Sequence, residues 1–323
     1  MANSENRAEP PLEGGSSNSS AILSAIAAYG IWGLLPVYWK CFDQVPAYEV
    51  LVHRIVWSFV FMAALIPVFG RWEMLKREAA CIWKNRKKRL CLAAGSILIS
   101  FNWLTYIWAI NHDRVVESSL GYFINPLLNV LAGVLVLRER LSLWQFLAVI
   151  WAAIGVVYLT VNYGSFPFVA LFLATSITFY SLCKKTVGLS AVSGMFLETA
   201  LIAPIALVIL AVLYHDGKAY PIGLTSTFLL LAGTGVVTAV PLLLNAHSLN
   251  KLPLSVLGVL QYLSPSLTLM LGVFLYGEDF SRSHLIAFSF IWSALVLFSI
   301  ARTGFMKNLE RRLSGRLGRT FSR

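Results

Sequence analysis

Long apolar runs follow one another along the chain, separated by short polar or basic stretches. We read ten runs of about 20 residues, at positions 20–40, 47–69, 90–110, 115–137, 142–161, 166–185, 192–214, 224–247, 254–276 and 283–301. A helix of about 20 apolar residues crosses the ~30 Å hydrocarbon core of a bilayer. The pattern therefore predicts an all-α membrane protein with ten transmembrane helices.

The two ends of the chain differ from these apolar runs. Residues 1–19 are rich in Gly, Ser and Asn, which predicts a disordered N-terminus, and they are too polar for a signal peptide. The basic tail, residues 302–323, places apolar residues four positions apart among arginines: Phe305, Leu309, Leu313, Leu317 and Phe321. This spacing favours an amphipathic helix lying on the anionic inner leaflet of the membrane.

Charge predicts the orientation of the helices. Only 13% of the residues are charged and 58% are hydrophobic. If the N-terminus is cytoplasmic, 21 of the 26 Lys and Arg residues fall in inside segments, and the outside loops hold only Arg114, Lys218 and Arg282. Because basic residues concentrate in cytoplasmic loops, we expect both termini in the cytoplasm. The same distribution accounts for the net charge of +11, so no nucleic-acid partner is expected.

The second half of the chain repeats the first with an offset of 139 residues. INPLLNVLAGVLVLRE (124–139) aligns without a gap on LSPSLTLMLGVFLYGE (263–278), and the identities include the proline, glycine and glutamate positions. A unit of five helices has an odd number of crossings, so the second unit enters the membrane from the opposite side. Such inverted repeats are the architecture of alternating-access transporters. We therefore predict two five-helix units, over residues 20–161 and 166–301.

The repeat also indicates a site. In the segment 115–137, three polar side chains at i, i+3 and i+7 share one helix face, and the offset maps them onto three polar side chains of the segment 254–276. We expect these stripes to line a substrate cavity, each beside a kinking proline and near the segment 90–110. The candidate substrate-binding residues are Tyr122, Asn125, Asn129, Gln261, Ser264, Thr268, Asn102 and Tyr106, and the candidate hinges are Pro126 and Pro265. The alternative is that these polar residues only join helices together.

Two charged residues lie inside apolar segments. Charges buried in a membrane usually face the protein interior and mark a pathway. We expect Arg54 to bind an anionic or polar part of the substrate, and Glu198 to be the coupling-ion candidate. A purely structural role of Arg54 stays open, as do a packing or a relay role for its neighbour His53. The remaining carboxylates near the apolar segments, Glu49 and Glu117, are expected in solvent at the outer interface.

Several motifs together resemble one family. They are IWGLLPVYWK, HRIVWSF, NWLTYIWAIN, SLGYFINPLLNV, LRERL, TAVPLLLNA and LGVLQYLSPSLTLMLGVFLYGE. They look like the RarD family, a bacterial branch of the EamA group in the drug/metabolite transporter superfamily, over residues 22–301. The resemblance implies a multi-pass protein of the bacterial inner membrane, a secondary transporter linked by name to chloramphenicol sensitivity. The sequence departs from the expected pattern at Asn245, His247 and Ser264-Pro265-Ser266.

The function we expect is export of small metabolites or amphipathic compounds by alternating access. The alternatives are an intramembrane enzyme acting on lipid, and a channel or passive facilitator. HExxH, GxGD, GxSxG and P-loop motifs are absent from the sequence, and the four cysteines lack metal-site spacing. We therefore expect no catalytic residue, metal or cofactor. The expected partners are a small-molecule substrate and the lipid bilayer, and a homo-oligomer stays open.

Overall fold

The structure is a computed structural model that describes residues 15–137, 143–163, 166–221, 223, 225–249, 251–252, 256–257 and 260–301. The described residues are helical and contain no strand. The helices of the first half are α1 (Gly15–Lys40), α2 (Ala47–Val68), α3 (Trp72–Trp83), α4 (Arg86–Asn111), α5 (Val115–Leu137) and α6 (Leu143–Tyr163). Those of the second half are α7 (Phe168–Val187), α8 (Ala191–His215), α9 (Ser226–Leu249), α11 (Leu263–Met270), the π-helical segment η1 (Leu271–Leu275) and α12 (Arg282–Ala301).

The helix bounds follow the apolar pattern closely. The first eight predicted segments and the tenth each coincide with one helix, with ends that differ by five residues at most. In the described part of the chain, seven helices are long and apolar enough to cross a membrane. The predicted tail helix and Glu139 of the repeat lie outside the described residues.

Two features differ from the predicted pattern. The basic stretch between the second and third segments, which we expected to be a loop, contains the short helix α3. The segment 254–276 is not one continuous helix: a turn at Gln261 and Tyr262 precedes α11, and η1 follows it. Pro265 contributes to the break at Gln261, because a proline has no N–H to donate to the carbonyl four residues earlier and its ring crowds that carbonyl.

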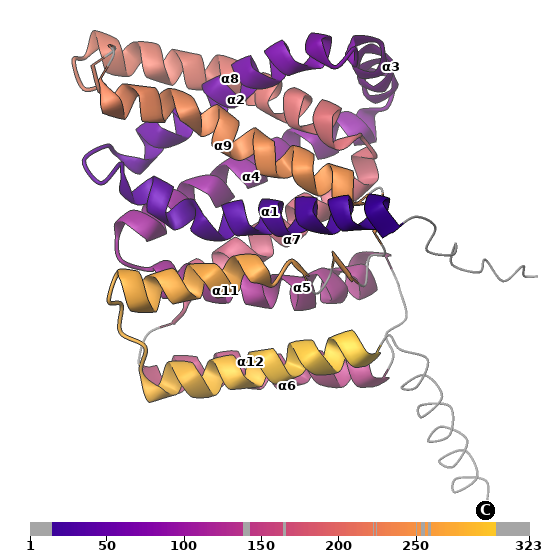
Figure 1. Ribbon diagram of the computed structural model, residues 1–323, viewed down its shortest axis with the longest axis vertical. Helices are drawn as coiled ribbons and strands as arrows, with labels where there is room; N and C mark the ends of the chain where they lie inside the picture. Colours follow the sequence, from indigo (N-terminus) through magenta and orange to yellow (C-terminus); the bar gives the residue numbers. More distant parts are fainter. Residues whose placement is uncertain are drawn as a thin grey trace, which may run out of the picture.

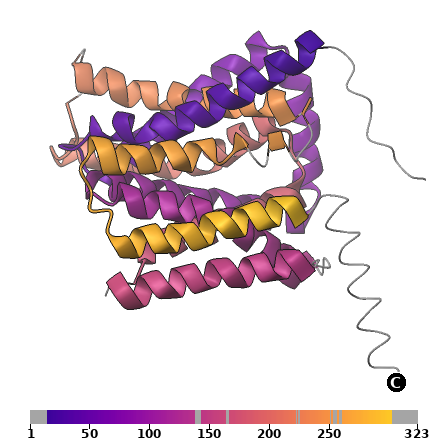
Figure 2. The same cartoon turned by 60° about the horizontal axis from the view of Figure 1, so that its bottom comes forward.

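The long helices run side by side, and α3 lies across one end of the bundle (Figures 1 and 2). This is the end at which α1 begins and α12 ends, and we call it the terminal end; the other is the opposite end. Helices α6 and α12 pack against each other and form one edge of the molecule (Figure 1). The remaining long helices pack in the pairs α4–α7, α5–α7, α2–α8, α2–α9, α1–α9 and α1–α11.

Glutamates bind helix N-termini at the opposite end. The Glu278 carboxylate accepts hydrogen bonds from the N–H groups of Val115 and Val116, at 2.6 and 2.7 Å, where α5 begins. Helix N-termini attract carboxylates because their first N–H groups have no partner within the helix. Glu117 accepts in the same way from Val169 N–H in the first turn of α7.

Glu49 also binds backbone instead of solvent. It is 1% exposed, and its carboxylate accepts a hydrogen bond from the N–H of Tyr220 at 2.5 Å. The expectation that Glu49 and Glu117 are simply solvated was therefore wrong. Sequence position alone placed them at an interface, but it could not show the N–H groups that approach from distant segments.

We expect Glu278→Gln to lower the thermal stability of the protein. An amide can accept one of the two N–H bonds but presents its own NH2 to the other donor, and an unsatisfied buried donor costs about 1–3 kcal/mol. The thermal unfolding midpoint in detergent should fall by several degrees. The matched control is Glu73→Gln, because Glu73 is exposed and pairs only with Lys76 on the surface. Equal midpoints for the two variants would contradict the role of Glu278.

Candidate functional site: a central cavity with a buried arginine

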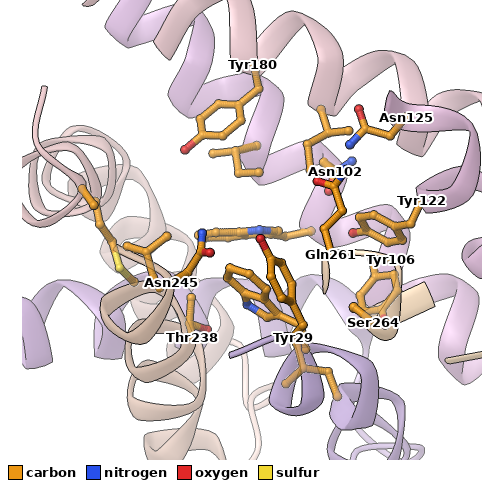
Figure 3. Close-up of a pocket in the computed structure, with 18 of the residues that line it drawn as sticks. Tyr29, Asn102, Tyr106, Tyr122, Asn125, Tyr180, Thr238, Asn245, Gln261 and Ser264 are labelled. Atoms are coloured by element: carbon orange, nitrogen blue, oxygen red, sulfur yellow. The ribbon is translucent and has the colours of Figure 1, made fainter. Parts of the chain in front are cut away.

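A cavity of about 420 Å³ lies between the helices and is lined mainly by apolar and aromatic side chains. This volume falls in the usual range for small-molecule sites. Polar side chains from α1, α4, α5, α7, α9 and the start of α11 converge on it (Figure 3). Helices α6 and α12 contribute no lining residue. The cavity is thus built by the inner helices, while the α6–α12 pair packs outside it.

The structure gathers most of the predicted site residues in this cavity. Its lining includes Arg54, Asn102, Tyr106, Tyr122, Asn125, Gln261, Ser264, Thr268, Glu198, Pro126 and Pro265. Asn129 is the exception, since it is exposed and does not line the cavity. Helical spacing placed Asn129 on the face of Tyr122 and Asn125, but it could not show that the neighbouring helices stop covering that face before Asn129.

Arg54 is the most unusual side chain of the cavity. It is 5% exposed, its Nε donates a hydrogen bond to Thr238 Oγ1 at 2.9 Å, and its Nη1 has no hydrogen-bond partner among the described residues. Its Cζ lies 4.0 Å from the ring centroid of Trp103 and 4.9 Å from that of Trp39. Within the described residues, no carboxylate forms an ion pair with it. The arginine charge is therefore stabilised by two indole rings and one hydroxyl. This leaves some N–H groups of the guanidinium available to a ligand.

Some of the predicted polar residues join helices instead of facing open space. The Asn102 amide nitrogen donates to the Leu173 carbonyl at 3.0 Å and to Ser176 Oγ at 2.9 Å, which ties α4 to α7. Thr268 Oγ1 donates to the Gly33 carbonyl at 3.3 Å. The Asn102 carbonyl oxygen is buried and has no hydrogen-bond partner among the described residues. The hydrogen-bond donors of Asn102 and Thr268 are therefore used to join helices, as the alternative interpretation of the sequence expects. Only the oxygen atoms of these two side chains, which accept hydrogen bonds, can contribute to ligand binding.

Glu198 interacts with two side chains of α7. Its Oε2 accepts a hydrogen bond from the Tyr180 hydroxyl at 2.9 Å, and its Oε1 lies 3.5 Å from Lys184 Nζ. Lys184 also donates to the Tyr180 hydroxyl at 2.6 Å. The negative charge of Glu198 is therefore compensated by Lys184. In the described structure, no contact joins Glu198 to Arg54.

Several lining residues were not predicted. Thr238, Tyr180 and Lys184 belong to this group, as do the aromatic residues Tyr29 and Trp32 of α1. Lys184 was counted as a cytoplasmic loop residue, because it lies near a helix end. Its spacing of four from Tyr180 was a usable signal, but the approach of Glu198 from another helix was not visible in the sequence. Of the positions that depart from the family pattern, Asn245, Ser264 and Pro265 line the cavity, and His247 is exposed.

His53, next to Arg54, points elsewhere. It is 2% exposed, its ring meets the edge of Phe228 with centroids 6.1 Å apart, and neither ring nitrogen has a hydrogen-bond partner among the described residues. It does not line the cavity. These contacts favour the packing role over the relay role.

Among the described residues, the lining of the cavity extends to the terminal end of the bundle and not to the opposite end. Its lining reaches Ala191, the first residue of α8, and Leu249, the last residue of α9, both at the terminal end. Towards the opposite end, buried residues of one apolar cluster fill the space, among them Trp39, Phe42, Ile107, Ile110 and Val115. We call these five residues the apolar plug. The plug separates the cavity from the opposite end.

Long apolar helices around a mainly apolar cavity with a few convergent polar side chains define a multi-pass membrane protein that can hold a small solute. The EamA-like transporter family matches residues 19–161. The uncharacterized transporter YojE of Bacillus subtilis is 46% identical over 87% of this chain and 94% of its own length. Protein RarD of Escherichia coli K12 is 41% identical over 86% of this chain and 93% of its own. A crystal structure with 19% identity supports the fold, with a TM-score of 0.55 over 89% of this chain and 99% of that chain.

The chain belongs to the RarD family of the drug/metabolite transporter superfamily, which confirms the resemblance seen in its motifs. It is a membrane transporter of that kind, in the bacterial inner membrane. The relatives reported above are named as transporters or as RarD, and not as enzymes.

Proposed function

We propose that the protein exports small amphipathic metabolites that carry an anionic or strongly polar group, by alternating access of the central cavity. Arg54 binds the anionic or polar group, and the aromatic lining, with Tyr106, Tyr122 and Trp103, contacts the apolar part. Asn125, Gln261 and Ser264 supply further polar contacts in the cavity.

The observation that carries this proposal is the environment of Arg54. A guanidinium that is 95% buried without a carboxylate partner is costly in a membrane protein unless something stabilises it. The indole rings and Thr238 do so in part, and Nη1 remains without a partner. An anionic group in the cavity would complete this arrangement through charge-assisted hydrogen bonds.

The helix contacts support an inverted repeat as the basis of alternating access. If α1, α2, α4, α5 and α6 form the first unit, their counterparts in the second are α7, α8, α9, α11 and α12. The pairs α1–α9, α1–α11 and α2–α9 then have the counterparts α7–α4, α7–α5 and α8–α4, all of which occur. Exchange of the two units' conformations would open the apolar plug and close the terminal end. A channel would instead need a path through both ends, and the described cavity has only one.

We expect both termini, and the open end of the cavity, to face the cytoplasm. Two exposed cysteines test this orientation: Cys41 follows α1 at the opposite end, and Cys81 lies on α3 at the terminal end. A membrane-impermeant maleimide should label Cys41 in right-side-out vesicles and Cys81 in inside-out vesicles. The variants Cys41→Ser and Cys81→Ser identify the labelled position. The reverse pattern would contradict the orientation.

Export itself is tested by metabolite profiling of cells and medium. Cells that express the wild-type protein are compared with cells that lack it. The proposal expects a class of amphipathic anionic or polar compounds to fall inside the wild-type cells and rise in their medium. Accumulation of the same class inside wild-type cells would indicate import, and a change confined to the lipid fraction would support the alternative of a lipid-modifying enzyme.

A further inference from the structure

Helix α3 has one face bound to the protein and one face exposed. Its buried residues, Leu75 and Ile82, are seven positions apart and lie on the same side of the helix. On the same side, Glu78 accepts hydrogen bonds from the N–H and the hydroxyl of Ser190, at 3.1 and 2.9 Å. Ser190 is the N-cap residue of α8, so α3 is fixed to the end of a helix that lines the cavity.

The exposed side of α3 combines aromatic and basic residues. Trp72 is 47% exposed and Trp83 67% exposed, at the two ends of the helix. The stretch 71–89 contains eight Lys and Arg residues and only two acidic residues. Five of these basic residues are exposed and make neither a side-chain hydrogen bond nor an ion pair with a described residue: Arg77 and Lys84 on and directly after α3, and Arg86, Lys87 and Arg89 in the first turn of α4. We call these five the α3 basic surface.

The position of α3 places this surface at the level of lipid headgroups. The helix lies across the ends of the long helices and joins α2 to α4 (Figures 1 and 2). Tryptophan prefers the membrane–water interface, where its apolar ring and its N–H are both accommodated. Amphipathic helices with aromatic residues and basic side chains bind at this level, most strongly to anionic lipids.

We propose that the α3 basic surface is a binding site for the anionic headgroups of phospholipids, separate from the central cavity. The lipid phosphate contacts the Lys and Arg side chains, and Trp72 and Trp83 contact the upper part of the acyl chains. Charge complementarity favours lipid as the occupant, because anionic headgroups are the charged partner always present at this depth. This site does not depend on the identity of the transported compound.

Native mass spectrometry of the full-length protein, titrated with phosphatidylglycerol or with phosphatidylcholine, tests the site. The test variant is Arg77→Gln/Lys84→Gln/Lys87→Gln. The matched control, Arg114→Gln/Lys218→Gln/Arg282→Gln, removes three charges from the opposite end. The wild type and the control should bind phosphatidylglycerol at least tenfold more tightly than phosphatidylcholine, and the test variant should lose most of this preference, the remainder coming from the basic tail, residues 302–323. Thermal unfolding of each variant verifies that it is folded.

Two results would overturn the proposal. One is a test variant that binds phosphatidylglycerol within twofold of the wild type. The other is a wild type that binds the two lipids equally, which would show that this surface does not select anionic headgroups. A folded test variant that loses lipid preference but still exports its substrate would support the lipid site and leave the transport proposal untouched.

Discussion

Arg54→Ala should abolish export while the protein stays folded in the membrane. Truncating one partner of a buried, hydrogen-bonded charge pair costs about 2–5 kcal/mol, so the apparent affinity for an anionic substrate should fall about 100-fold or more. Stability should change little, because no carboxylate among the described residues would be left unpaired. Thr238 Oγ1, which loses the arginine, still donates to the Thr234 carbonyl at 2.8 Å.

The comparison with Arg54→Lys separates charge from geometry. A lysine keeps the charge but lacks the planar fork and its stacking on Trp103 and Trp39, so we expect an intermediate loss of transport. Transport rates are measured at equal amounts of protein in the membrane, together with thermal unfolding midpoints. If Arg54→Ala failed to fold, the structural role of Arg54 would be the correct one. If it folded and transported as the wild type does, Arg54 would have no role in binding.

Gly235→Val should prevent assembly of the helix bundle. A Cβ atom at Gly235 would lie 2.3 Å from the carbonyl oxygen of Trp57 and 2.9 Å from the backbone nitrogen of Ser58. Because these atoms are backbone, the clash can be relieved only by moving α9 away from α2. Small residues permit such close helix contacts in membranes. Overpacking typically costs about 1–3 kcal/mol, and we expect at least the upper end here.

The contact of Gly235 with Trp57 also lies one helical turn from the Arg54–Thr238 hydrogen bond, so a shift of α9 would disturb the cavity. The matched control is Gly30→Val in α1, since a Cβ there meets no atom within 4 Å. Yield of monodisperse protein after detergent extraction distinguishes the two variants. Equal yields and equal unfolding midpoints would show that α2 and α9 separate at little cost.

Sequence patterns predicted the individual helices well. Apolar length gave nine of the segments as single helices, because a bilayer allows few other ways to satisfy the backbone. It missed α3, whose apolar residues Leu75 and Ile82 follow helical spacing but are too few to span a membrane. The break before α11 was also missed. Pro265 and its repeat partner Pro126 occupy equivalent positions, yet α5 continues through Pro126. A proline alone therefore does not decide between a kink and a break.

The sequence predicted which residues line the candidate site better than it predicted the contacts between their side chains. The repeat offset and helical periodicity found residues of both stripes that line the cavity, because the polar stripes of α5 and α11 both face it. Contacts between helices depend on three-dimensional packing that periodicity does not contain. The pairing of Glu198 with Lys184, and the placement of Arg54 between two tryptophans, are of this kind. The roles of these residues in transport remain predictions.

The most direct test of a substrate site in the central cavity is protection of a cysteine placed inside it. The protein would carry Ser264→Cys with Cys41, Cys91 and Cys183 replaced by Ser, and Cys81 retained as an internal reference outside the cavity. A small thiol reagent is applied to purified protein with and without the exported compound found by profiling. The account predicts that the compound slows labelling at position 264 and leaves labelling of Cys81 unchanged. Equal labelling at position 264 with saturating compound would contradict it.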